Sequence, residues 1–177
     1  AGVTAIAAGT RAGVEEAVHT FAAEEMDAAG VPGIVFVMVD ANGTAIAEVF
    51  GLADVSGGRQ MTADTPLRVG SISKPVTAAL GLELTARGEI DLDVPVDTYL
   101  DVELTDRYGQ ASTVRQLLQH RGGYPDAFAE SHHLEAEDAQ GLDEWVRKLA
   151  DRSIAPNVVA SYSSVGYTLA GAGMAGA

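Results

Sequence analysis

A near-continuous apolar run over residues 33–39, Gly-Ile-Val-Phe-Val-Met-Val, is followed directly by Asp40-Ala41-Asn42-Gly43. Such a run is typical of a strand that is buried on both faces. Asn-Gly is the dipeptide that most favours the tight turn of a β-hairpin. We therefore expect a partner strand over residues 44–50, followed by an irregular polar stretch over 51–65.

Helices are expected around this hairpin. Apolar residues recur at helical spacing over residues 10–29, where Val14, Phe21 and Met26 are three of them, and Gly30 and Pro32 end the pattern. Beyond residue 65 strand patterns largely disappear, and residues 89–100 are typical of a loop. The later helices are expected at residues 71–87 (stopped by Gly88), 113–120 (opened by a Thr113-x-x-Gln116 capping box), 142–150 and 163–175.

The fold class expected from this order is α+β, with a helix and antiparallel strands in the first third and an all-helical region after them. A chain of 177 residues, 47% of them hydrophobic, fits one domain with a real core. The absence of cysteine excludes a disulfide framework, a thiolate zinc site and a cysteine nucleophile.

The net charge of −14 disfavours binding to nucleic acid or to anionic membranes. No stretch approaches the ~20 apolar residues of a membrane span, so membrane insertion is not expected. Two explanations of the acidity stay open, a solvated surface that keeps the protein soluble and an adaptation to high salt.

Ser71 and Lys74, in Arg-Val-Gly-Ser-Ile-Ser-Lys-Pro, form the pair that points to chemistry. At the start of a helix this spacing puts a hydroxyl and an amine on one face, so that the amine can take the proton of the hydroxyl. With nine serines and two lysines in the chain, chance predicts only ~0.1 such pairs. The alternative is an ordinary helix cap at Ser71 with a solvated Lys74.

No metal site is expected. His132 and His133 lie between Glu130 and Glu135, but adjacent histidines on a helix diverge by about 100°, which favours a solvated segment. Trp145 is most simply a core residue of its helix.

The surroundings of Ser71 resemble the serine β-lactamase and penicillin-binding-protein superfamily, and in particular the branch of class C β-lactamases with their D-aminopeptidase and esterase relatives. The resemblance spans about residues 30–171, and its motifs occur in the family's order. The segments that carry it are Phe50-Gly-Leu-Ala-Asp54 and residues 62–79, 87–100, 113–125 and 161–171.

This resemblance implies a β-lactamase/transpeptidase-like fold and a serine hydrolase that needs no cofactor. It identifies Ser71 as the nucleophile, Lys74 as its proton partner, and Tyr162 as the family's tyrosine, which acts as general base or acid. The substrate would be a small molecule or peptide, either an ester, a D-amino-acid peptide or a β-lactam. The resemblance also favours an extracellular or cell-surface location, which the residues themselves do not identify.

Two positions near these residues are of interest. The family's Tyr-x-Asn is Tyr162-Ser163-Ser164 here, so Ser164 stands where an amide would contact the substrate. Either the shorter hydroxyl binds the substrate through a water, or the contact that the amide would make is lost. That loss would weaken activity on amides and β-lactams more than activity on esters. His120 matches a family histidine that usually precedes Thr-Ser-Gly, and it is expected to fix the loop after its helix.

The family's third motif, Lys- or His-x-Gly on a later strand, does not follow Tyr162 in these 177 residues. We therefore expect one partial β-lactamase-like domain over 1–177 with an incomplete sheet. Residues 1–70 would form its helix and hairpin, and residues 71–177 its mostly helical part. The missing half is expected in a longer chain rather than in a partner protein. The alternative function is a catalytically inactive, penicillin-recognition-like domain or fragment.

Overall fold

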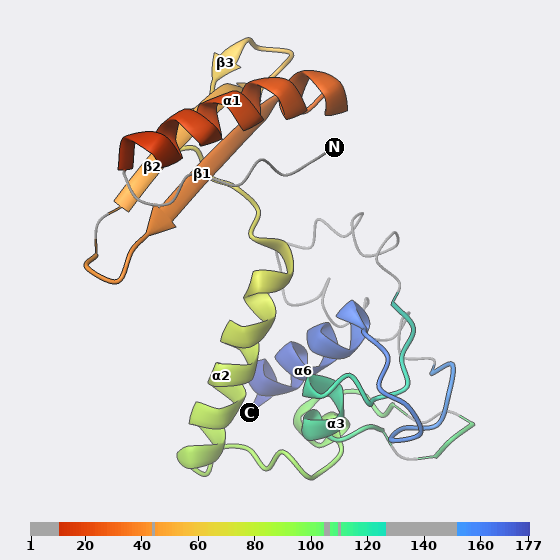
Figure 1. Ribbon diagram of the computed structural model, residues 1–177. Coiled ribbons are helices and arrows are strands. Elements are labelled where there is room, and N and C mark those ends of the chain that lie inside the picture. The colour runs from red at the N-terminus through yellow and green to blue at the C-terminus, as the bar shows by residue number, and fades with distance from the viewer. Residues whose placement is uncertain (1–10, 44, 105–106, 110, 127–151) are drawn as a thin grey trace. The chain divides into compact units, whose positions relative to one another are not determined.

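The computed structural model describes residues 11–43, 45–104, 107–109, 111–126 and 152–177. The chain divides into two compact units, Ala1–Arg68 and Val69–Ala177 (Figure 1). Unit 1 holds a helix and three strands, and unit 2 holds every other described element. The expected helix over 142–150, His132, His133 and Trp145 lie outside the described residues. The single domain over 1–177 stays a prediction.

Helix α1 (Arg11–Ala29) is rich in alanine and glutamate, which favour helices, and an Arg11–Glu15 ion pair of 2.7 Å supports its first turns. It ends at Gly30, whose φ of 64° lies in the left-handed region that favours glycine. Ala22 is its buried residue, whereas Phe21 is 63% exposed although it belongs to the apolar pattern.

Strands β1 (Gly33–Val39) and β2 (Ala45–Asp54) form the predicted antiparallel hairpin, in a register that runs from Gly33 opposite Gly51 to Val39 opposite Ala45. The expectation that the apolar run is buried on both faces is wrong in unit 1. Val37 and Val39 are 60% and 63% exposed, because side chains alternate along a strand and α1 is the one helix among the described residues of this unit.

The stretch expected to be irregular after β2 contains a short third strand, β3 (Arg59–Gln60), which pairs antiparallel with β2. The turn between them is closed by the Asp54 carboxylate, which accepts hydrogen bonds from Ser56 Oγ at 2.7 Å and from the Gly57 N–H at 3.1 Å. These two bonds hold the pKa of Asp54 below its ordinary value. The sheet therefore has three strands in the order β1-β2-β3 among the described residues.

Unit 2 begins with the 3₁₀ turn η1 (Gly70–Ile72), which leads directly into α2 (Ser73–Ala86). Gly88, with a φ of 74°, follows the end of α2 as predicted. The loop after it contains a second 3₁₀ turn, η2 (Val96–Tyr99). None of the helices that the structure describes is long and apolar enough to cross a membrane.

Helix α3 (Val114–Leu118) opens with the predicted capping box. The Gln116 N–H donates to Thr113 Oγ1 at 3.2 Å, and Gln116 Oε1 accepts from the Thr113 N–H at 3.0 Å. The helix ends earlier than residue 120, because His120 adopts a left-handed φ of 58° that no helix can include.

Helix α6 (Ser164–Gly176) is the central helix of unit 2 and contacts α2, α3 and η2 (Figure 1). Its small residues allow this, since a Cβ at Gly173 would lie 2.6 Å from Val96 Cγ2. The core gathers apolar side chains from all of these segments: Ile90, Leu92, Val96, Leu104, Ala111, Val114, Leu117, Tyr124, Val165, Leu169, Ala170, Ala172 and Met174.

A buried arginine joins two distant segments of unit 2. Arg152 is 1% exposed, and it donates to Ser112 Oγ at 3.4 Å and to the Gly109 carbonyl at 3.1 Å. Gly123 lies at the same junction, where its carbonyl accepts from the N–H groups of Ser153 and Ile154. These bonds fix the start of the segment that leads to Tyr162.

Replacing Gly123 by alanine is expected to lower the free energy of unfolding by about 3 kcal/mol. Gly123 has a φ of 83°, and a Cβ there would overlap the Ile154 carbonyl. Gly88→Ala is the matched control, since it has the same left-handed φ but open space around it, and it should cost only about 1 kcal/mol. Urea unfolding of both variants measures the difference, and equal losses would contradict this packing.

Candidate active site

Ser71 lies in η1, directly before α2, and its hydroxyl does not cap either element. The N-cap positions are Val69 for η1 and Ile72 for α2, and neither makes a side-chain cap bond. The Ser71 hydroxyl instead lies 2.6 Å from the hydroxyl of Tyr162, 91 residues away in the chain. The reading of Ser71 as an ordinary helix cap is therefore wrong.

Lys74 completes this cluster from the first turn of α2. Its Nζ donates to Ser71 Oγ at 3.2 Å and lies 4.7 Å from the centre of the Tyr162 ring. A second, longer bond joins Lys74 Nζ to Ser164 Oγ at 3.4 Å. All four residues named from the sequence, Ser71, Lys74, Tyr162 and Ser164, thus lie within one set of contacts.

The Tyr162 phenol is electrostatically tuned by this arrangement. Hydrogen bonding from Lys74 is the largest cause that lowers the pKa of Tyr162 from its ordinary 10.0, and the bond with Ser71 is the second. A cation beside a phenol favours the phenolate, which is the form that can accept a proton. The side chain is 48% exposed, so a substrate can reach it.

The first turn of α6 is held by residues from the loop after α3. Ser163 caps the helix by accepting from the Gly166 N–H at 2.9 Å, and its hydroxyl donates to the Pro125 carbonyl at 3.1 Å. The Ser164 N–H donates to the Asp126 carboxylate at 3.0 Å. These bonds fix the backbone at the start of α6, next to Tyr162 and at Ser164.

His120 lies behind Tyr162. Its ring centre is 4.6 Å from that of Tyr162 and 4.9 Å from that of Tyr167, and its Nδ1 accepts from the Ser163 N–H at 3.1 Å. Desolvation, and then the charge of Lys74, hold the pKa of His120 below its ordinary 6.5. The ring's hydrogen bond goes to the segment before α6 rather than to the loop after α3, where the sequence predicted it, and the ring also contacts the candidate catalytic tyrosine.

One further segment has the sequence pattern of a catalytic motif but not its structure. His120-Arg121-Gly122 matches the His-x-Gly pattern of the family's third motif, but it forms the turn after α3 and not a strand. Within the described residues, no three His, Cys, Asp or Glu side chains gather as metal ligands.

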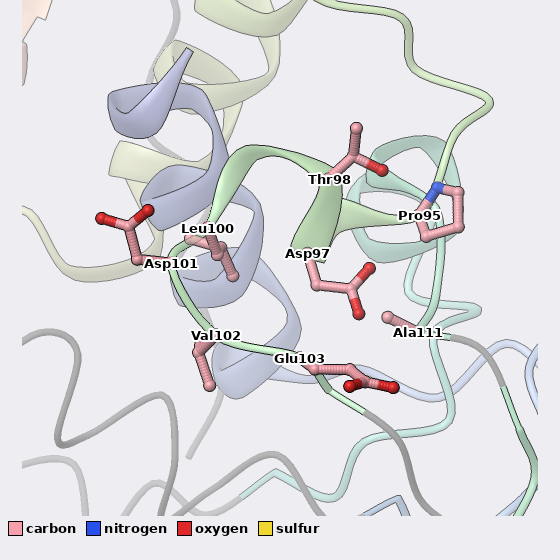
Figure 2. A pocket seen from close by; sticks show the side chains of 8 residues that line it. All are labelled: Pro95, Asp97, Thr98, Leu100, Asp101, Val102, Glu103 and Ala111. Carbon is pink, nitrogen blue, oxygen red and sulfur yellow. The ribbon is translucent and has the colours of Figure 1, made fainter.

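Unit 2 also has a pocket of about 550 Å³ that includes none of the four site residues. Figure 2 shows that η2 and the chain after it form most of its wall. Its carboxylate Asp97 accepts from the Leu104 N–H at 3.0 Å, a structural role. The lining residues are Pro95, Asp97, Thr98, Leu100, Asp101, Val102, Glu103 and Ala111.

Asp126 and Tyr167 are the site neighbours that the sequence did not reveal. Asp126 follows a proline in a loop, where an acidic residue is common for local reasons. Tyr167 donates from its hydroxyl to the Leu118 carbonyl at 2.9 Å, which is a long-range contact without a local pattern.

Known proteins are similar to this chain in sequence and in fold. The Beta-lactamase family model matches residues 18–177. Esterase EstB of Burkholderia gladioli is 36% identical over 130 residues, which cover 64% of this chain and 33% of that protein. A Beta-lactamase of Yersinia enterocolitica is 28% identical over 148 residues, which cover 81% of this chain and 35% of that protein. The chain thus spans about a third of the length of these relatives.

Among solved structures, the octameric penicillin-binding protein homologue from Pyrococcus abyssi is similar with a TM-score of 0.73 and 24% identity. The match covers 91% of this chain and 38% of that one. This likeness confirms the expected fold class, β-lactamase/transpeptidase-like with antiparallel strands and a helical part. With the family model matching most of its length, the chain belongs to the Beta-lactamase family.

Proposed function

We propose that this chain carries the acylation centre of a serine hydrolase that works through a covalent acyl-enzyme, with esters as its preferred substrates. The observation that supports this most is the position of the Ser71 hydroxyl, 2.6 Å from Tyr162 and 3.2 Å from Lys74 Nζ. A nucleophilic hydroxyl within hydrogen-bond reach of a base, itself oriented by a third group, is the arrangement that activates serine.

Acylation proceeds from the Tyr162 phenolate. Ser71 Oγ gives its proton to the Tyr162 oxygen while it attacks the ester carbonyl carbon, and the carbonyl oxygen takes the negative charge. Hydrogen bonding from Lys74 stabilises the phenolate beforehand, as the lowered pKa of Tyr162 indicates. When the tetrahedral intermediate collapses, the alcohol leaves and takes the proton from Tyr162.

Deacylation uses the same groups in reverse. Tyr162 removes a proton from a water, the resulting hydroxide attacks the acyl carbon, and collapse returns that proton to Ser71 Oγ as the carboxylic acid is released. The backbone N–H of Ser71, in the 3₁₀ turn that leads into α2, is one donor to the oxyanion, since a helix N-terminus favours negative charge.

Two findings favour esters over amides and β-lactams. Ser164 offers Lys74 and the substrate one hydroxyl in place of the family's amide, and this hydroxyl is 3.4 Å from Lys74 Nζ. An ester carbon is more electrophilic than an amide carbon and depends less on such a contact. Esterase EstB, at 36% identity, is a relative with this activity in its name.

Ser164→Asn is expected to raise acylation by a penicillin about tenfold relative to acylation by an aryl ester. The asparagine amide can donate to a lactam carbonyl while its oxygen accepts from Lys74, which one hydroxyl cannot do through separate atoms. Stopped-flow acylation rates for both substrates measure the ratio, with Ser164→Ala as the control that adds no amide. A ratio unchanged in Ser164→Asn would remove Ser164 from the account of specificity.

The competing function is a penicillin-recognition-like domain that binds without turnover. Intact mass after incubation with a short-chain aryl ester, and separately with a chromogenic cephalosporin, distinguishes the two. We expect ester turnover with a transient acyl adduct, because Tyr162 can serve both half-reactions. A stable adduct without turnover would favour the binding domain.

A further inference from the structure

We propose that His120 is a positioning residue for the reaction: as a neutral imidazole it holds Tyr162 against Ser71 and Lys74, and its protonation releases that hold. This inference rests on the proposed function of Ser71 and Tyr162. His120 takes no part in making or breaking bonds, but its ring contacts Tyr162, which transfers the proton.

The contacts of His120 converge on the segment that carries Tyr162. Its Nδ1 accepts from the Ser163 N–H at 3.1 Å, and its carbonyl accepts from the Ser161 N–H at 2.8 Å. These bonds fix the backbone on both sides of Tyr162. The His120 ring stacks against the phenol between them, with centres 4.6 Å apart and planes inclined by 30°. One side chain and its carbonyl therefore restrain Tyr162 in three ways.

The bond to Ser163 requires the neutral ring. A protonated imidazole carries hydrogen on both nitrogens, so Nδ1 could no longer accept from a backbone N–H. It would also place a second positive charge beside Lys74, whose ammonium contacts the same tyrosine ring at 4.7 Å. Protonation of His120 would therefore break the hydrogen bond to Ser163 and add repulsion from Lys74.

On balance, the groups that face His120 favour the neutral ring. Burial is the largest cause that lowers its pKa below 6.5, and Lys74 on α2 is the second. The Asp126 carboxylate opposes these two more weakly, whereas the N–H that Ser163 donates to Nδ1 is compatible only with the neutral ring. The rings of Tyr162, just before α6, and Tyr167, within α6, also contact the imidazole. Since the folded-state pKa lies below the ordinary one, the stabilisation is complete above pH 6.5 and is lost as the pH falls through the folded-state value.

The backbone at His120 decides which variants can test this. Its φ of 58° is left-handed, so alanine there would add strain that has no connection with Tyr162. Glycine and asparagine both tolerate this conformation. Asparagine keeps an acceptor, because its Oδ1 is bonded to Cγ as Nδ1 is in histidine, and it does not titrate. Glycine removes the acceptor and the ring together.

The experiment measures the second-order rate constant for labelling of Ser71 by a fluorophosphonate between pH 5 and 8. At pH 7.5 we expect His120→Gly to be about 10- to 100-fold slower than the wild-type chain, and His120→Asn to recover most of that loss. Below pH 6.5 the ratio of the wild-type rate to the His120→Asn rate should fall as His120 is protonated, because asparagine does not titrate and the rest of the site is common to both chains. Equal rates for all three chains, or a pH-independent ratio, would overturn the inference.

A readout that needs no catalysis separates this inference from the proposed function. In NMR titrations the Tyr162 phenol should keep its lowered pKa in His120→Asn and return toward 10.0 in His120→Gly. The His120 ring itself should be unprotonated at Nδ1 at pH 7.5. If Ser71 takes no label in any chain, the proposed function fails, while these titrations still decide whether His120 positions Tyr162. A Tyr162 pKa that is the same in both variants contradicts it.

Discussion

Ser71→Ala is expected to abolish covalent labelling by a fluorophosphonate and to lower ester turnover by about 10⁴- to 10⁶-fold. The reason is that the Ser71 hydroxyl is the nucleophile on which both half-reactions depend. Tyr162 and Lys74 keep their positions in this variant but have no oxygen to activate. Their contacts with Ser71, at 2.6 and 3.2 Å, would simply be lost.

Ser73→Ala is the matched control for this change. Ser73 begins α2 two residues later and is also exposed, so the two serines differ mainly in whether Tyr162 and Lys74 face them. The Ser73→Ala chain should take the label at the wild-type rate. Labelling of Ser71→Ala at the wild-type rate, measured by gel fluorescence over time, would remove Ser71 from the mechanism.

Tyr162→Phe is expected to lower the acylation rate by about 10²- to 10⁴-fold while leaving the fold intact. The phenol oxygen is the group that takes the proton from Ser71, and its pKa is lowered first by Lys74 and then by Ser71. Because the active form is the phenolate, acylation should rise with pH through a midpoint below 10.0. This rise should be absent in Tyr162→Phe.

Tyr108→Phe serves as the control for loss of a phenol oxygen. The Tyr108 hydroxyl donates to the Ser153 carbonyl at 2.9 Å, which is a structural bond of the loop. Stopped-flow acylation by an aryl ester compares the two variants. An acylation rate for Tyr162→Phe within a few-fold of the Tyr108→Phe rate would mean that Lys74 alone activates Ser71.

The elements that the sequence predicted well are those whose cause is local. The hairpin at Asn42-Gly43, the capping box from Thr113 to Gln116 and the stop at Gly88 each depend on residues within a few positions of one another. The one-turn separation of Ser71 and Lys74 is of the same kind, and their hydrogen bond follows from it.

The sequence could not predict what depends on distant segments. The early end of α3 results from the left-handed backbone at His120, whose ring and carbonyl bond to residues near Tyr162. The contact of Ser164 with Asp126 joins residues 38 positions apart, and no periodic pattern in the sequence predicts it. Tyr162 could be related to Ser71 only through a family resemblance, since 91 residues separate them.

The most direct test of the proposed acyl-enzyme is the location of the adduct. The chain is quenched with acid during turnover of a short-chain aryl ester, digested, and its peptides are mapped by tandem mass spectrometry. We expect the acyl group on Ser71, within the peptide that also contains Lys74, and none on Ser73. An acyl group on any other residue, or turnover without an acylated peptide, would contradict the assignment of Ser71 as the nucleophile.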